Sequence, residues 1–258
     1  MPKVVLHFLR HSIKEKAPEK DDKDIKLSPE GRALAAEKFD DPMDMRYAHV
    51  VGSPRVRTHE IAVAAATGDS SLRPEDLGVG KVRVDETLDF KDEGGVYGEA
   101  FNKAYTDGRL LPFLLQESDV LARENGDTAS STYSRSAANI ASIIHRNYEV
   151  ASRGAAILEQ SENPENTRND FERVLATHGT IQECFLLKVV EKLKGVQERD
   201  ILLSLIGDNG FDYVEGFDVT LSKDNGVETI RITYKKGDYT LDENVPIEII
   251  EEIEGERQ

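Results

Sequence analysis

The sequence predicts an α/β fold, a three-layer α/β/α sandwich with a mostly parallel sheet, a helical insertion and a C-terminal antiparallel β extension. One observation is a plan that occurs three times along the chain, in which an apolar strand is followed by a polar turn and then by a helix. The other is that the first of these strands, with Val4, Val5, Leu6, Phe8 and Leu9, has the apolar character of a strand buried on both faces of a parallel sheet. Strands that alternate with helices form parallel sheets covered on both sides.

The first unit opens the chain. Residues 3–9 are predicted to form a short buried strand, which ends in Arg10 and His11. Further on, in LSPEGRALAAEKF, Ser28 is the expected N-cap of a helix and Pro29 its first residue.

The second unit is YAHVVGSPRVRTHEIAVAAATG, with a predicted strand over residues 47–52. Ser53 is the expected N-cap of its helix, Pro54 the first helical residue and Gly68 the end.

The third unit has a predicted strand over 171–177 and a helix over about 180–194 with one apolar face. A fourth strand is predicted over 81–88.

Composition excludes several classes of protein. The formal net charge of −16 argues against a nucleic-acid binder. No apolar run approaches the roughly 20 residues of a membrane span, and the run after Lys3 is too short for a signal peptide. Cys184 is the only cysteine, which indicates a cytoplasmic protein. His7 and His11 would lie about 13 Å apart on a strand, so no metal site is expected.

Each strand-to-helix turn places a distinctive side chain at the same edge of the predicted sheet. The first turn supplies Arg10 and His11, the second Arg57, and the third His178. Ligands bind at the carboxyl ends of the strands in open α/β sheets. Two arginines and two histidines there predict a positive pocket suited to a phosphate dianion, because Arg offers paired N–H groups to its oxygens.

FLRHS, GSPRVRTHEIA and ATHGT, in that order and spacing, resemble the histidine phosphatase superfamily, also called phosphoglycerate mutase-like. The resemblance covers about residues 3–193 and implies an enzyme without metal or cofactor. It implies that His11 is the nucleophile and forms a phosphohistidine. Arg10, Arg57 and His178 would be catalytic with it, binding the phosphate oxygens.

Two positions depart from the pattern of this family. Ser12 follows the nucleophile where Gly is frequent, and Phe90 stands where many members carry the Glu that protonates the leaving group. Several carboxylates lie nearby, so a shifted register is expected to supply the proton donor. Asp89 and Glu93 are the two candidates, and the sequence does not choose between them.

The leading hypothesis is therefore a phosphatase that hydrolyses a small phosphate monoester through phospho-His11. A phosphoglycerate mutase-type phosphotransferase is the first alternative; its second anion would need further cations, and the insertion offers only scattered ones, Lys103, Arg109, Arg123 and Arg135. A catalytically weak module that binds a phosphorylated ligand is the other, motivated by Phe90.

Residues 1–195 are predicted to form the α/β domain, with the helical insertion over about 97–165. Residues 196–258 are predicted to form a β-meander, with a hairpin turn at Asn225-Gly226, and an acidic tail. We expect this segment to pack on the main domain and to stay out of the catalytic pocket, since its net charge of −10 would repel a phosphate. A homodimer formed through an edge strand is the alternative.

Overall fold

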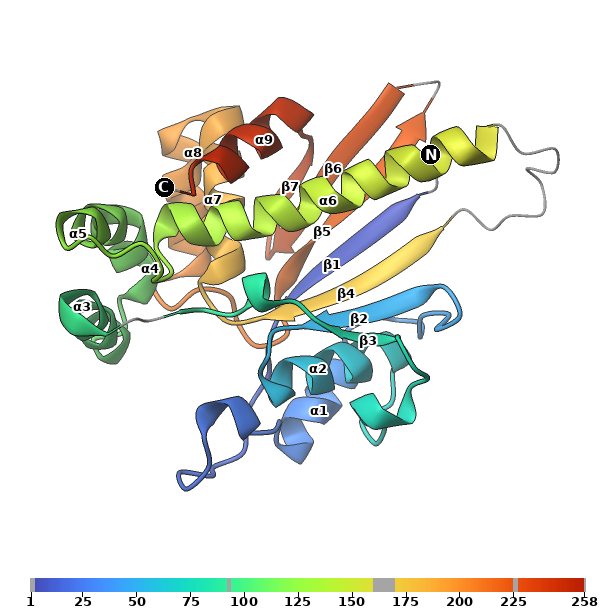
Figure 1. Ribbon diagram of the computed structural model, residues 1–258, viewed down its shortest axis with the longest axis horizontal. Helices are drawn as coiled ribbons and strands as arrows, with labels where there is room; N and C mark the ends of the chain where they lie inside the picture. The colour runs from blue at the N-terminus through green and yellow to red at the C-terminus, as the bar shows by residue number, and fades with distance from the viewer. Residues whose placement is uncertain (1–2, 92–93, 160–169, 225–226, 258) are drawn as a thin grey trace.

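A mixed sheet forms the centre of the molecule, with strand order β3-β2-β4-β1-β5-β6-β7 (Figure 1). The computed structural model describes residues 3–91, 94–159, 170–224 and 227–257. The strands are β1 (Val4–Arg10), β2 (Ala48–Gly52), β3 (Val82–Val84), β4 (Phe171–Thr177), β5 (Gly216–Asp224), β6 (Val227–Lys236) and β7 (Tyr239–Asn244). β1 to β4 run parallel, and β5 to β7 extend the sheet antiparallel from β1, as predicted.

β1 and β4 are the neighbouring strands that matter for the site. They pair in parallel from Val4 with Phe171 to Arg10 with Thr177. Both strands therefore end at the same level, and the residues that follow them, His11 and His178, leave the sheet side by side.

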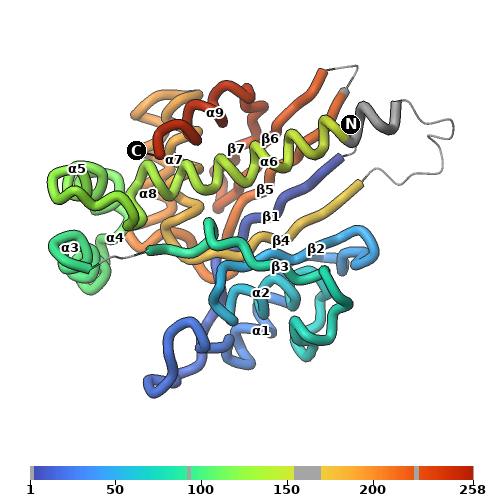
Figure 2. Tube along the Cα trace, in the orientation of Figure 1, coloured from blue at the N-terminus to red at the C-terminus, as the bar shows by residue number. Residues whose placement is uncertain are grey.

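Helices cover the two faces of the parallel part of the sheet, which confirms the predicted sandwich (Figures 1 and 2). On one face lie α1 (Pro29–Ala36) and α2 (Val56–Thr67), which form a core with residues such as Leu9 and Val50. On the other face lie α6 (Tyr133–Glu159), α7 (Ile181–Lys194) and α9 (Ile247–Gly255), which pack with Leu6 and Phe8. Among the helices of the described ranges, none combines the length and the apolar character needed to cross a bilayer.

The N-cap predicted for α1 is confirmed, whereas the N-cap predicted for α2 is wrong. Ser28 Oγ accepts a hydrogen bond from Gly31 N, so it caps α1 as predicted. α2 begins at Val56 and not at Pro54, with Arg55 at the N-cap and no side-chain cap. The predicted cap, Ser53, instead bonds side chains within the site. Gly68, in a left-handed conformation, ends α2 as predicted.

β3 is shorter than the predicted 81–88. Asp85 Oδ1 accepts hydrogen bonds from Thr87 N and Thr87 Oγ1, and this starts a 3₁₀ turn, η3 (Glu86–Leu88), directly after the strand. The turn carries Asp89 and Phe90 away from the sheet edge, beneath the ends of β1 and β4.

The segment between β3 and β4 is helical, as predicted for the insertion. Its elements before α6 are α3 (Gly95–Thr106), α4 (Leu110–Phe113), a π-helical turn η4 (Leu114–Ser118) and α5 (Asp119–Glu124). Figure 1 shows α3, α4 and α5 in green on the side toward which β1 and β4 point. The predicted connector after residue 160 lies outside the described residues up to 169.

The last part of the chain is a meander flanked by two helices that were not predicted. Residues 196–206 form α8 (Val196–Ile206) and not a strand. The acidic tail forms α9, in which Ile250 and Ile253 are fully buried and the carboxylates of Glu252 and Glu256 pair with lysines of α7. The tail is therefore an amphipathic helix rather than a solvated charge run. The predicted turn at Asn225-Gly226 lies outside the described residues.

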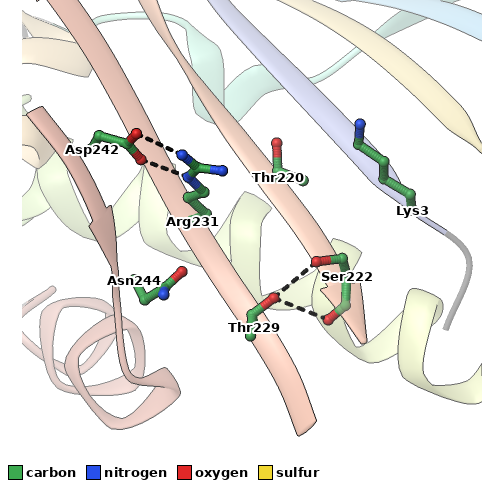
Figure 3. Close-up of a pocket in the computed structure, with 7 residues that line it drawn as sticks. All are labelled: Lys3, Thr220, Ser222, Thr229, Arg231, Asp242 and Asn244. Atoms are coloured by element: carbon green, nitrogen blue, oxygen red, sulfur yellow. Dashed lines mark hydrogen bonds and ion pairs between the residues drawn. The ribbon is translucent and has the colours of Figure 1, made fainter. Parts of the chain in front are cut away.

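The meander has one apolar and one polar face. Phe217, Val219, Leu221, Ile230, Ile232 and Tyr234 are buried, as the alternation predicted. On the opposite face, Figure 3 shows a shallow polar hollow, in which Arg231 pairs with Asp242 and Ser222 bonds Thr229. This hollow lies away from the carboxyl ends of β1 and β4.

Candidate active site

His11 and His178 meet at the carboxyl ends of β1 and β4. His11 N donates to the Thr177 carbonyl at 2.9 Å, which continues the pairing of the two strands beyond Arg10. The centroids of the two imidazole rings are 5.2 Å apart. Two imidazole rings this close together can contact the same phosphate group.

The His11 ring is held as a neutral imidazole. Its Nδ1 lies 2.8 Å from the carbonyl oxygen of Ser12, which can only accept, so Nδ1 carries the proton and Nε2 keeps its lone pair. Burial, with the neighbouring charges of His178, Arg57 and Arg10, lowers the pKa of His11 to about 3. A neutral imidazole with a free lone pair on Nε2 has the form of a nucleophile.

His178 is almost fully buried beneath the site. Its Nε2 lies 2.9 Å from Ser53 Oγ and 3.2 Å from Asp89 Oδ1. Burial lowers the pKa of His178 to about 4, although the Asp89 carboxylate acts in the opposite direction. Since Nε2 faces a carboxylate, it carries the ring proton and Nδ1 faces away from Asp89.

Arg10 is held by a loop from the C-terminal segment. Its Nη1 donates to the main-chain carbonyls of Phe211 and Asn209, and its guanidinium carbon lies 5.5 Å from the centre of the Tyr213 ring. The C-terminal segment therefore contacts Arg10 through the loop before β5. Neutral carbonyl oxygens, and no carboxylate, accept these two hydrogen bonds.

Arg57 comes from the first turn of α2, and its side chain is 3% exposed. Its Nη1 donates to the Asp22 carbonyl at 2.6 Å, and its Nη2 to Asp22 Oδ2 at 2.9 Å. The structure thus brings Arg57 to the site and adds Asp22 to it.

Of the two candidate proton donors, Asp89 lies in the site and Glu93 lies outside the described residues. Asp89 Oδ1 is 2.6 Å from Arg55 Nε as well as 3.2 Å from His178 Nε2. Burial alone would raise the pKa of Asp89, but hydrogen bonds from His178 and Arg55 hold it below its usual range. Phe90 packs edge-on against His178 and under Arg55, with no carboxylate at that position.

Four buried polar atoms around His11 have no hydrogen-bond partner within the described residues. They are Arg10 Nε, Ser12 Oγ, Arg57 Nε and His178 Nδ1. Buried polar groups are nearly always paired, so several unpaired ones at one place indicate a site built for a polar ligand. Three of them are donors, which suits an anion.

Three residues of the site were not assigned to it from the sequence. Ser53 was predicted only as a helix cap, and Arg55 and Asp22 were not considered. The sequence SPRVR has an arginine, Arg55, two residues before Arg57, and this spacing could have indicated that Arg55 also lies in the site. Nothing in the spacing pointed to Asp22, because a loop of irregular structure brings it to the arginines.

His7 and His11 have different partners: His7 Nδ1 lies 2.8 Å from Asp218 Oδ1 on the meander side of β1, whereas His11 Nδ1 bonds the Ser12 carbonyl. Within the described ranges, no group of three or more His, Cys, Asp or Glu side chains is arranged to hold a metal ion. Cys184 is fully buried in α7, and burial raises the pKa of its thiol.

No family model and no curated protein matches the chain. A solved phosphoglycerate mutase from Bacillus anthracis str. Sterne superposes with a TM-score of 0.51 at 15% identity, over 97% of this chain and 96% of that one. A mycobacterial glucosyl-3-phosphoglycerate phosphatase gives 0.44 at 18% identity, over 86% and 92%, and mycobacterial hydrolase 1 gives 0.47 at 19%, over 89% and 95%. The chain thus has the fold of that phosphoglycerate mutase along nearly its whole length.

Proposed function

We propose that this chain is a histidine phosphatase that hydrolyses a small phosphate monoester through a phosphohistidine on His11. The observation that carries the proposal is the set of unpaired buried donors on Arg10, Ser12 and Arg57 around a neutral His11 ring. The phosphoglycerate mutase fold, with these residues at the carboxyl ends of its strands, supports it.

The first chemical step is attack of His11 Nε2 on phosphorus. The P–O bond to the leaving alcohol breaks as the N–P bond forms. The Nδ1–H bond to the Ser12 carbonyl orients the ring and stabilises the positive charge that develops on it. In this proposal Arg10 and Arg57 bind the equatorial oxygens, and His178 does so once the bound phosphate dianion has brought a second proton to its ring, on Nδ1. Most of the catalysis of phosphoryl transfer arises at these oxygens. Water then attacks phosphorus, the P–N bond breaks, and the Asp89 carboxylate left by the first step takes the proton that water loses; phosphate and the free ring are released.

Asp89 is the proton donor that we propose for the leaving alcohol. In the structure it is a carboxylate, held in that form by His178 and Arg55. A phosphate dianion bound beside it would raise its pKa, because two negative charges close together disfavour the ionised form. Asp89 would then take up a proton as substrate binds and give it to the leaving oxygen.

A phospholigand-binding module is the second candidate function, favoured by the ion-paired state of Asp89. A mutase receives less support, because cations of the insertion are committed to neighbouring groups. Arg109 pairs with Glu117, Lys103 with Asp107, and Arg135 donates to two main-chain carbonyls.

The cytoplasm is the compartment that we propose, since the only cysteine is a buried free thiol. The proposed partner is a small phosphorylated molecule.

The test is hydrolysis of p-nitrophenyl phosphate by the purified protein. We expect turnover in the wild type and its loss in His11→Ala, with an acid-labile phosphohistidine that mass spectrometry assigns to His11. The matched control is His145→Gln on α6, a histidine bonded to Glu254, which should retain wild-type activity. Activity that survives in His11→Ala would overturn the proposal, whereas phosphate binding without turnover would favour the binding module.

A further inference from the structure

A carboxylate of the protein itself gathers the cations next to His11. Arg57 Nη2 and Arg55 Nη1 both donate to Asp22 Oδ2, and Lys14 Nζ lies 3.0 Å from Asp22 Oδ1. Burial alone would raise the pKa of Asp22, but the hydrogen bonds from Lys14 and Arg57 hold it well below its usual range. Three cations thus converge on one carboxylate.

We propose that Arg55 and Lys14 join Arg57 in an anion-binding subsite for the phosphate group of the substrate, and that Asp22 occupies this subsite until the phosphate displaces it. The inference rests on the proposed function, which assigns Arg57 to the phosphate. The two oxygens of Asp22 stand where two phosphate oxygens would accept the same hydrogen bonds.

The arginines are the fixed part of this arrangement, and Asp22 is the movable part. The side chains of Arg57 and Arg55 are 3% and 14% exposed, whereas that of Asp22 is 42% exposed. Asp22 lies on the 3₁₀ turn η1 (Asp22–Asp24), which has no buried residue and is capped by Asp21. A phosphate dianion offers more charge and more acceptor oxygens than one carboxylate, so it competes well for the guanidinium groups.

Arg55 also connects this subsite to the proposed proton donor. Its Nε is bonded to Asp89 while its Nη1 faces Asp22, and its guanidinium lies over the Phe90 ring. A phosphate held by Arg55 would therefore lie beside Asp89. In the proposed mechanism Asp89 takes up a proton because a phosphate dianion lies beside it, and this subsite would hold the phosphate at that place.

The test is the affinity for inorganic phosphate, measured by titration calorimetry on the full-length protein. If Asp22 leaves the subsite about one-tenth of the time, Asp22→Asn should bind phosphate about tenfold more tightly, because the binding-competent state is then always available. The control is Asp24→Asn, which removes an equal charge from the exposed end of the same turn. It should change the affinity less than about twofold, since exposed charges are screened by salt.

Two further variants sharpen the result. Asp22→Ser should show the same gain, which guards against a fold defect specific to asparagine. In the Asp22→Asn background, Arg55→Gln should remove most of the gain, because Arg55 would be one of the groups that bind the phosphate.

Equal phosphate affinities in Asp22→Asn and Asp24→Asn, or weaker binding in Asp22→Asn, would overturn the inference. Phosphate binding needs no turnover, so this outcome is separate from the His11→Ala result. Loss of hydrolysis in His11→Ala with no effect of Asp22→Asn rejects only the subsite. A gain in Asp22→Asn with hydrolysis intact in His11→Ala rejects only the phosphohistidine function.

Discussion

Gly179 makes room for Arg10 at the turn between β4 and α7. A Cβ atom at this position would lie 2.9 Å from both the guanidinium carbon and Nε of Arg10. These atoms belong to the far end of a flexible side chain, so the conflict is relieved by moving Arg10 rather than the backbone.

We therefore expect Gly179→Ala to reduce activity much more than stability. The displaced guanidinium should raise KM for p-nitrophenyl phosphate by about tenfold, the loss of roughly one charged hydrogen bond. The free energy of unfolding should change by less than about 1 kcal/mol. Gly78→Ala is the control, because a Cβ there meets no atom within 4 Å. Equal kinetics for the two variants would show that Arg10 does not need its present position.

The residues of the site were predictable where they follow a strand. Arg10, His11 and His178 are fixed by the ends of β1 and β4, and Arg57 by the start of α2, so spacing and periodicity found them. Asp22 and Arg55 owe their places to a loop and a helix N-terminus whose conformations depend on tertiary contacts. For that reason, the pairing of these two residues could not be predicted from the sequence.

For α9, the acidic composition of the sequence led to a wrong prediction. Its many glutamates suggested a solvated tail. Its isoleucines, however, recur at helical spacing, and the side chain of Ile250 is fully buried in the core. The lysines of α7 neutralise two of its carboxylates. β4 was predicted with its observed bounds because its second half, VLAT, is buried between two neighbouring strands. The length of β3, at the sheet edge, was overestimated.

Ile250→Ala should lower the free energy of unfolding by about 2–5 kcal/mol, since it leaves a cavity between α9 and the helices beneath it. Urea denaturation followed by circular dichroism measures the change. Glu251→Ala, an exposed position on the same helix, should change it by no more than about 0.5 kcal/mol. Similar values for the two variants would mean that α9 contributes little to the folded core.

For the whole molecule, the buried histidines link stability to pH. The pKa of His178 is lowered to about 4 in the folded chain, while the unfolded chain has the ordinary value of about 6.5. Between these values the unfolded state binds more protons, so stability is lost as pH falls from about 6.5 toward 4.

Unfolding measured at pH 7 and pH 5 in a phosphate-free buffer tests this linkage. His178→Gln should lose about 1–2 kcal/mol less over this interval than the wild type, because it removes one such titration. His11 remains in both proteins. Because His178 contributes to lowering the pKa of His11, the substitution also reduces the loss of stability that His11 causes, and both effects have the same sign. An equal loss in the two proteins would show that His178 is not held neutral by the fold.

The position of β1 has a consequence for how the chain is made. β1 pairs with β4 on one side and β5 on the other, and Phe171, the first residue of β4, is 167 positions beyond its partner Val4. At a synthesis rate of about 5–20 residues per second, roughly 8–30 s pass on the ribosome before that partner exists. During this interval the apolar stretch VVLHFLR has neither neighbour. The unpaired strand is then open to aggregation, and it is a target for a chaperone that binds short apolar segments.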